Sequence, residues 1–95
     1  MKVYISGRIK DYDGYVGHFK RVHDYLEAIG HEIVNPCELT AEQLSYEEFM
    51  KLDIIEMLKC DAICMLKGWE TSSGARCEHL IAAMCGMKFM YEESL

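Results

Sequence analysis

The sequence has little positive charge. Its ten Lys and Arg residues are scattered along the chain, and sixteen Asp and Glu residues outnumber them, which gives a net charge of −6. A surface that binds nucleic acid needs clustered Lys and Arg to meet the phosphate backbone. We therefore expect no nucleic-acid partner.

Long apolar runs are absent as well. No stretch reaches the roughly 18 consecutive apolar residues of a transmembrane helix, and the first ten residues, MKVYISGRIK, become polar too soon for a signal peptide. We expect a cytoplasmic protein with no membrane partner.

The cysteines lack the close spacing of a metal or redox motif. Five of them stand at positions 37, 60, 64, 77 and 85, without a C-x-x-C pair. This odd, dispersed set is typical of reduced thiols in a cytosolic protein. A zinc site would require Cys60 and Cys64 to join Cys77 and His79, but Cys64 lies within an apolar strand run. We expect cysteines in the core, no metal and no cofactor.

No repeat, low-complexity segment or interdomain linker interrupts the 95 residues, so we expect one domain over residues 1–95. Short extended runs alternate with segments of helical periodicity. The expected strands cover residues 2–6, 31–36, 61–66 and 88–91, and the expected helices cover residues 15–29, 46–59 and 74–85. This alternation predicts an α/β fold in which helices cover both faces of a parallel sheet.

Polar residues mark the starts of two helical segments. Thr40, with Gln43 three residues later, is expected to cap one short turn. Ser45, with Glu48 three residues later, is expected to begin the helix 46–59 through a capping box.

Two glycine-bearing loops follow the first and third expected strands. In an open parallel sheet, ligands bind beyond the carboxyl ends of the strands. The loops are SGRIKDYDGYVG (6–17) and KGWETSSGA (67–75), and the first adds Arg8 and Lys10. Glycines and hydroxyls let backbone N–H groups approach an anion, so these loops suit a phosphate or a polyol. The alternative is that both are ordinary surface turns.

An acid interrupts the apolar stripe of the helix 74–85. Glu78 has the helical spacing of Ile81, Ala82 and Cys85, so its carboxylate should lie near the strand ends, with the helix dipole favouring its ionised form. A nearly buried carboxylate that faces a cleft suits a nucleophile or a general base. The alternative is an electrostatic helix cap, assisted by a serine of the preceding loop.

A second acid shows the same irregularity. Asp53 shares a helical stripe with the apolar residues Tyr46, Phe49, Met50 and Met57. Two carboxyl groups beside one cleft can divide the nucleophilic and proton-transfer roles at a glycosidic carbon. The alternative for Asp53 is a hydrogen bond to nearby backbone or a solvated edge position.

Other polar and aromatic residues are less informative. Asp61 begins the third strand at the end opposite the loops, so we expect a structural role. Trp69 could stack on a base or sugar, or could close the end of the core. The four histidines have no partner evident in the sequence, and we expect satisfied or solvated side chains.

Several segments resemble one known superfamily. They are VYISGRI (3–9), the NP dipeptide (35–36) and SYEEFMKLDIIEMLKCDAICMLKGWETSSGARCEHLIAA (45–83). The chain is similar to the nucleoside 2-deoxyribosyltransferase-like superfamily, especially its short DUF4406-like branch of uncharacterised bacterial and phage proteins. The most specific part is an Asp-x7-Asp pattern followed by a G-x-x-x-E helix start.

The resemblance implies a flavodoxin-like (Rossmann-type) three-layer sandwich with strand order 2-1-3-4. It also implies cleavage of the N-glycosidic bond of deoxynucleosides or their 5'-monophosphates, by hydrolysis or transfer. Glu78 matches the nucleophile, Asp53 the acid that protonates the base or holds the sugar, and Tyr4 a tyrosine that hydrogen-bonds the nucleophile. Small-molecule nucleosides or nucleotides and a homodimer or larger oligomer are the implied partners.

The resemblance also implies a set of substrate-binding positions. Segment 7–10 resembles the phosphate loop of a nucleotide N-glycosidase branch, and Ser72 stands where that branch carries a serine. The expected substrate-binding residues are Ser6, Gly7, Arg8, Ile9, Lys10, Trp69, Ser72 and Gly74. Two alternatives remain open: a non-catalytic nucleotide-binding module that uses the same cleft, and a small scaffold protein.

Overall fold

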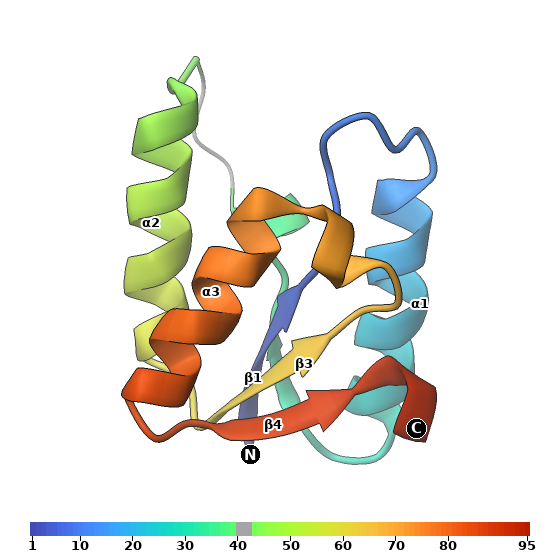
Figure 1. Cartoon of the computed structure of the whole chain (residues 1–95). Helices are drawn as coiled ribbons and strands as arrows, with labels where there is room; N and C mark the ends of the chain where they lie inside the picture. Colours follow the sequence, from blue (N-terminus) through green and yellow to red (C-terminus); the bar gives the residue numbers. More distant parts are fainter. Residues whose placement is uncertain (40–42) are drawn as a thin grey trace.

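The computed structural model describes residues 1–39 and 43–95, and its elements alternate between strand and helix (Figure 1). The strands are β1 (Lys2–Ser6), β2 (Glu32–Val34), β3 (Ala62–Met65) and β4 (Lys88–Tyr91). The helices are α1 (Tyr15–Ala28), α2 (Tyr46–Leu58) and α3 (Ser73–Met84), with short 3₁₀ helices η1 (Pro36–Glu38), η2 (Trp69–Thr71) and η3 (Glu92–Ser94).

The four strands form one parallel sheet in the order β2-β1-β3-β4. The α/β flavodoxin-like prediction and its strand order 2-1-3-4 are therefore confirmed. Because the strands are parallel, their carboxyl ends all lie at the same end of the sheet, where the loops into α1 and α3 begin. The N-terminus lies at the opposite end in Figure 1.

Alternating strand residues pack against helices on the two faces of the sheet. On one face, α1 contributes Phe19, Val22 and Leu26, which pack on Val3, Ile5, Ala62, Cys64 and Leu66. On the other face, Met57 of α2 and Ala75 and Ala82 of α3 pack on Tyr4, Ile63 and Met65. Figure 1 shows α2 and α3 side by side on this second face. The result is a three-layer sandwich in which β1 and β3 are buried on both faces.

Local sequence signals account for most element boundaries. Ser45 Oγ accepts the Glu48 N–H at 3.2 Å and the Glu48 carboxylate accepts the Ser45 N–H at 3.1 Å, so the expected capping box begins α2. The second strand ends earlier than expected, because the Asn35 side chain accepts the Cys37 N–H at 2.9 Å and starts η1. The expected cap at Thr40 lies outside the described residues.

The cysteine prediction was only partly right. All five thiols are free; Cys60 and Cys64 are buried, and Cys37 is half-buried. Cys77 and Cys85 are exposed, which corrects the expectation of core positions. Cys77 lies about 100° around α3 from the buried Glu78, and Cys85 is the cap residue where the chain leaves the helix.

Asp61 occupies the amino-terminal end of β3, opposite the loops. Its carboxylate accepts the Lys2 N–H at 2.9 Å, which joins the starts of two neighbouring strands and agrees with a structural role. Among the described residues, no helix is both long and apolar enough to cross a membrane.

Gly7 is required at the end of β1 by a close approach of two elements. An added Cβ would lie 3.0 Å from both Cβ and Cδ1 of the buried Leu66. Gly7→Ala is therefore expected to lower the free energy of unfolding by about 1–3 kcal/mol through overpacking, as measured by urea denaturation. Gly17→Ala on α1 is the control, since its Cβ would meet only the tip of Arg21 at 3.6 Å. Equal stability of Gly7→Ala and the parent would contradict this packing argument.

Candidate active site

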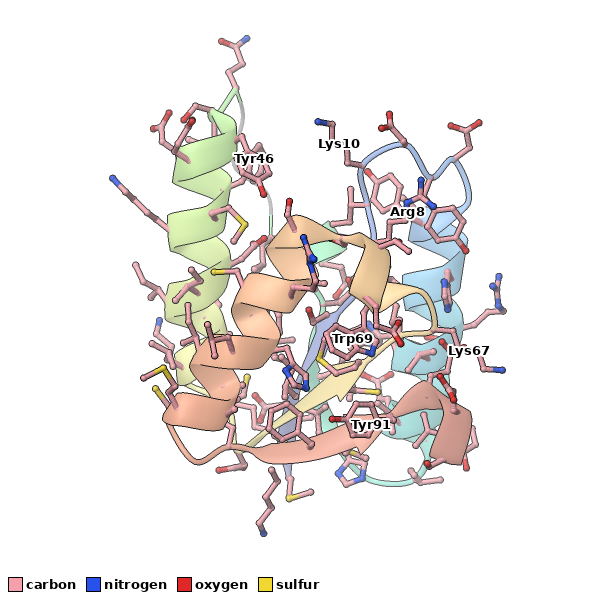
Figure 2. All side chains as sticks on the ribbon, viewed as in Figure 1. Arg8, Lys10, Tyr46, Lys67, Trp69 and Tyr91 are labelled. Atoms are coloured by element: carbon pink, nitrogen blue, oxygen red, sulfur yellow. The ribbon has the colours of Figure 1, made fainter. Side chains whose placement is uncertain are left out.

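A cavity of about 1070 Å³ opens at the carboxyl ends of the strands. Its walls come from the loop after β1, the segment around η1, the first two turns of α2 and the start of α3. Figure 2 shows Tyr46 at the start of α2 on one side, and Arg8 and Lys10 on the loop after β1 on the other. The volume lies just above the usual range of small-molecule sites, roughly 300–1000 Å³.

The Glu78 carboxylate lies at the base of this cavity and is held by two hydroxyl groups of β1. Tyr4 donates to Oε2 at 2.8 Å and Ser6 Oγ donates to Oε1 at 2.6 Å. Alternation along β1 places Tyr4 and Ser6 on the face that α3 covers. Glu78 is 6% exposed, yet it lines the cavity, so the acid is both oriented and accessible.

Burial controls the protonation of Glu78. It raises the pKa from 4.5 to about 7; the hydrogen bonds from Ser6 and Tyr4 lower it, and the charge of Asp53 raises it. We expected the helix dipole to favour the ionised form of Glu78, but burial of the carboxyl group has the larger effect and favours the protonated form. Burial and the neighbouring Glu78 raise the pKa of the Tyr4 phenol far above its ordinary value, so Tyr4 remains a hydrogen-bond donor.

Asp53 faces the same cavity from α2. Its side chain is half-buried, and burial raises its pKa from 3.8 to about 6. The cavity therefore holds two acids that both titrate close to neutral pH. This differs from ordinary surface carboxyl groups, which are ionised throughout that range.

Opposite substitutions around Glu78 are expected to move its pKa in opposite directions. Asp53→Asn removes a negative charge and should lower the pKa of Glu78, whereas Tyr4→Phe removes a stabilising hydrogen bond and should raise it. The side-chain carboxyl carbon of Glu78, followed by NMR across a pH titration, reports both changes. Asp24→Asn on the exposed face of α1 is the control and should leave the pKa of Glu78 unchanged. Shifts of the same sign in the two variants would refute this electrostatic picture.

Ser72 and Gly74 line the cavity at the start of α3. Ser72 is the N-cap, and its Oγ accepts the Ala75 N–H at 3.2 Å. Gly74 lies against α2: a Cβ on it would stand 3.4 Å from the Tyr46 hydroxyl and 3.5 Å from Met50 Sδ. The starts of α2 and α3 therefore lie close together.

Arg8 shapes the loop after β1 as well as lining the cavity. Its Nε donates to the Lys10 carbonyl at 3.2 Å and its Nη2 donates to the Asp11 carbonyl at 3.0 Å. Asp11 has a φ of +57°, a backbone region that few residues other than glycine adopt. Gly7, Ile9 and Lys10 also line the cavity. The segment 7–10 therefore forms one wall, with two cations on it.

Trp69 lies away from the residues that line the cavity. Its ring stacks on His79 with centroids 4.4 Å apart and an interplanar angle of 12°. His79 Nε2 is 3.2 Å from the Tyr91 hydroxyl, and its ring lies against Phe89. Of the two roles that the sequence left open for Trp69, this position corresponds to closing the end of the core.

A buried histidine, His18, connects both loops; it is satisfied, as expected, but through partners that the sequence did not reveal. His18 Nδ1 is 3.0 Å from the Tyr12 hydroxyl and Nε2 is 2.8 Å from Glu92 Oε1, which also accepts the Lys67 N–H at 2.7 Å. This network connects the loop after β1, the loop after β3 and the C-terminal η3. Glu92 is 74 residues from His18 in the chain, so no local pattern reveals the pair.

Apolar residues of the cavity wall were also missed. Tyr46, Phe49 and Met50 project from α2 on the stripe that contains Asp53, and Cys37 and Leu39 follow the second strand. The helical stripe was visible in the sequence, but its exposure to a cavity was not. Burial raises the pKa of the Cys37 thiol to about 11, so this thiol is protonated and unreactive near neutral pH. Among the described residues, no group of three or more His, Cys, Asp or Glu side chains could hold a metal ion.

Comparison with known proteins agrees with this architecture. The family model "Domain of unknown function (DUF4406)" matches residues 1–91. The chain belongs to this family. No curated protein matches this DUF4406 chain. It is similar in structure to the 2-deoxyribosyltransferase of the psychrotolerant bacterium Bacillus psychrosaccharolyticus, with a TM-score of 0.78 and 19% sequence identity over 96% of this chain and 71% of that chain. At this identity the likeness establishes the fold.

Proposed function

We propose that this DUF4406 chain cleaves the N-glycosidic bond of deoxynucleosides or their 5'-monophosphates, with Glu78 as the nucleophile. The observation that carries the proposal is the Glu78 carboxylate, which is buried, held by two hydroxyls and open to a cavity that also contains Asp53. A structural likeness to a 2-deoxyribosyltransferase supports the same class of chemistry.

The reaction proceeds in two displacements at C1' of the sugar. In the first, a Glu78 oxygen bonds to C1' while the C1'–N bond breaks, its electron pair leaves with the base, and Asp53 donates a proton to the base. In the second, water or another base attacks C1', Asp53 accepts the released proton, and Glu78 leaves as the carboxylate. Tyr4 and Ser6 keep the Glu78 carboxylate oriented through both steps.

The proposed roles require a particular protonation state of the two acids. With pKa values of about 7 for Glu78 and about 6 for Asp53, a single proton shared by the pair lies mainly on Glu78, so the reactive form, with Glu78 ionised and Asp53 protonated, is a minor fraction near neutral pH. A bell-shaped pH profile of activity is therefore expected. At low pH the nucleophile Glu78 is protonated, and at high pH the proton donor Asp53 is ionised.

The rest of the cavity offers surfaces for the other parts of such a substrate. Tyr46 and Phe49 present aromatic area on which a flat base can lie. Arg8 and Lys10 supply positive charge for a 5'-phosphate on the opposite wall.

A panel of deoxynucleosides and deoxynucleoside 5'-monophosphates tests the proposal. Release of free base, measured by chromatography with and without a second base as acceptor, separates hydrolysis from transfer. The same panel in a thermal-shift assay reports binding, because a ligand held only by the native state raises the melting temperature. Stabilisation without base release would favour the non-catalytic nucleotide-binding module. The absence of both stabilisation and base release would favour a scaffold protein.

A further inference from the structure

The strand β4 forms an open edge of the sheet. It pairs with β3 on one side, and in Figure 1 no described segment covers its other side. An uncovered edge presents unpaired backbone N–H and C=O groups that can pair with another strand. The opposite edge, β2, has only three residues and is followed by Pro36, so it is less suited to pairing.

The outward-facing backbone groups of β4 can be identified from its pairing with β3. The Lys88 N–H donates to the Asp61 carbonyl at 3.2 Å, so the backbone N–H and C=O groups of Lys88 point toward β3. The direction of the backbone N–H and C=O groups alternates from residue to residue along a strand. Those of Met90 therefore also point toward β3, while those of Phe89 and Tyr91 point outward. A partner strand would therefore bond to Phe89 and Tyr91.

The sequence of this edge is complementary to itself in the antiparallel direction. When KFMYE (88–92) is placed against a second copy with Met90 opposite Met90, Phe89 faces Tyr91 and Lys88 faces Glu92. This register pairs aromatic with aromatic residues and cation with anion, and it uses the two outward residues as hydrogen-bonded pairs. We propose that two copies of this chain associate through antiparallel β4–β4 pairing with Met90 at the two-fold axis, which forms a continuous eight-stranded sheet.

The charged residues of this register are available for the contact. Lys88 is exposed and makes no ion pair among the described residues. Glu92 follows β4 as the first residue of η3, and its Oε1 is held by His18 and the Lys67 N–H, so the contact with Lys88 of the second copy would use Oε2. This charge complementarity favours a second copy over an unrelated extended peptide.

Apolar surface on the same face of the sheet adds to the contact. The Phe89 and Tyr91 rings are nearly parallel, with centroids 6.1 Å apart, and Tyr91 is 38% exposed. Tyr91, labelled in Figure 2, also lies near His79, with ring centroids 6.5 Å apart.

Charge reversal tests the proposed pairing in the whole chain. Wild-type protein is expected to sediment as a concentration-dependent dimer in analytical ultracentrifugation. Lys88→Glu places like charges opposite each other twice in the symmetric contact and should weaken the dimer by about tenfold or more in Kd. Lys51→Glu on the exposed face of α2 changes the net charge equally and should leave the dimer unchanged.

Cross-linking tests the register. Residues opposite each other in a non-hydrogen-bonded antiparallel pair have Cα atoms about 4.5 Å apart, a separation that a disulfide spans. In a background with the exposed Cys77 and Cys85 replaced by Ser, Met90→Cys should oxidise to a covalent dimer, whereas Lys88→Cys should not. A wild-type monomer at all concentrations, or a dimer that resists Lys88→Glu and is not cross-linked through Met90→Cys, would overturn the proposal. Neither experiment depends on base release, so this inference and the proposed reaction can fail separately.

Discussion

Glu78→Gln is expected to reduce base release by about a thousandfold or more, because an amide cannot form the glycosyl ester that the proposed reaction requires. Gln has the size of Glu and can still accept one hydrogen bond, but its NH₂ group cannot accept from Tyr4 or Ser6. Single-turnover kinetics with the best substrate of the panel measure the loss.

Two controls separate chemistry from folding and binding. Glu70→Gln removes an exposed acid of η2 and should retain full activity. Glu78→Gln should still bind nucleotide in the thermal-shift assay, since the walls formed by Arg8 and Phe49 are unchanged. Mass spectrometry of the trapped wild-type enzyme should locate the sugar on the peptide that contains Glu78. A Glu78→Gln variant within a few fold of the wild-type rate would exclude Glu78 as the nucleophile.

The second large effect is on stability. Glu78 has a pKa of about 7 in the folded protein and 4.5 as its ordinary value, so the folded state binds this proton more tightly than the unfolded state. The stability that the raised pKa contributes is complete below pH 4.5 and is lost as pH rises through about 7. Relative to Glu78→Gln, which cannot titrate, the wild type is expected to lose about 3 kcal/mol of unfolding free energy across that window.

Urea denaturation of both proteins at a series of pH values measures this difference. The comparison removes most of the contribution of Asp53, whose pKa is also raised, because Asp53 is present in both proteins. Glu70→Gln should follow the wild-type curve at every pH. Parallel curves for the wild type and Glu78→Gln would contradict a raised pKa at this position.

The strands and helices could be predicted from local sequence patterns, because each pattern depends only on residues a few positions apart in the chain. Short extended runs marked the strands, among them the continuously apolar run of β3, and the capping pair Ser45 and Glu48 marked the start of α2. The strand order came from a resemblance rather than from periodicity, and the sheet has that order. The prediction that Cys77 and Cys85 are buried was wrong, because periodicity identifies the apolar stripe of a helix but not how wide the stripe is or where it ends.

The candidate site was partly readable for the same reason. An acid on an apolar stripe is visible without coordinates, and this picked out Glu78 and Asp53. Distances between distant residues were not visible: Tyr4 and Glu78 are 74 residues apart, and so are His18 and Glu92. The stacking of Trp69 on His79 likewise depends on how η2 lies over α3.

By itself, the sequence determined which segments become strands and helices, and it placed two acids on helix faces that turn inward, because hydrophobic periodicity and capping act over a few residues. Only the tertiary structure decided that Tyr4 and Ser6 hold Glu78, that burial moves its pKa to about 7, and that a cavity lies in front of it. These properties depend on desolvation and on contacts between segments far apart in the chain, which exist only once the parallel sheet brings its carboxyl ends together.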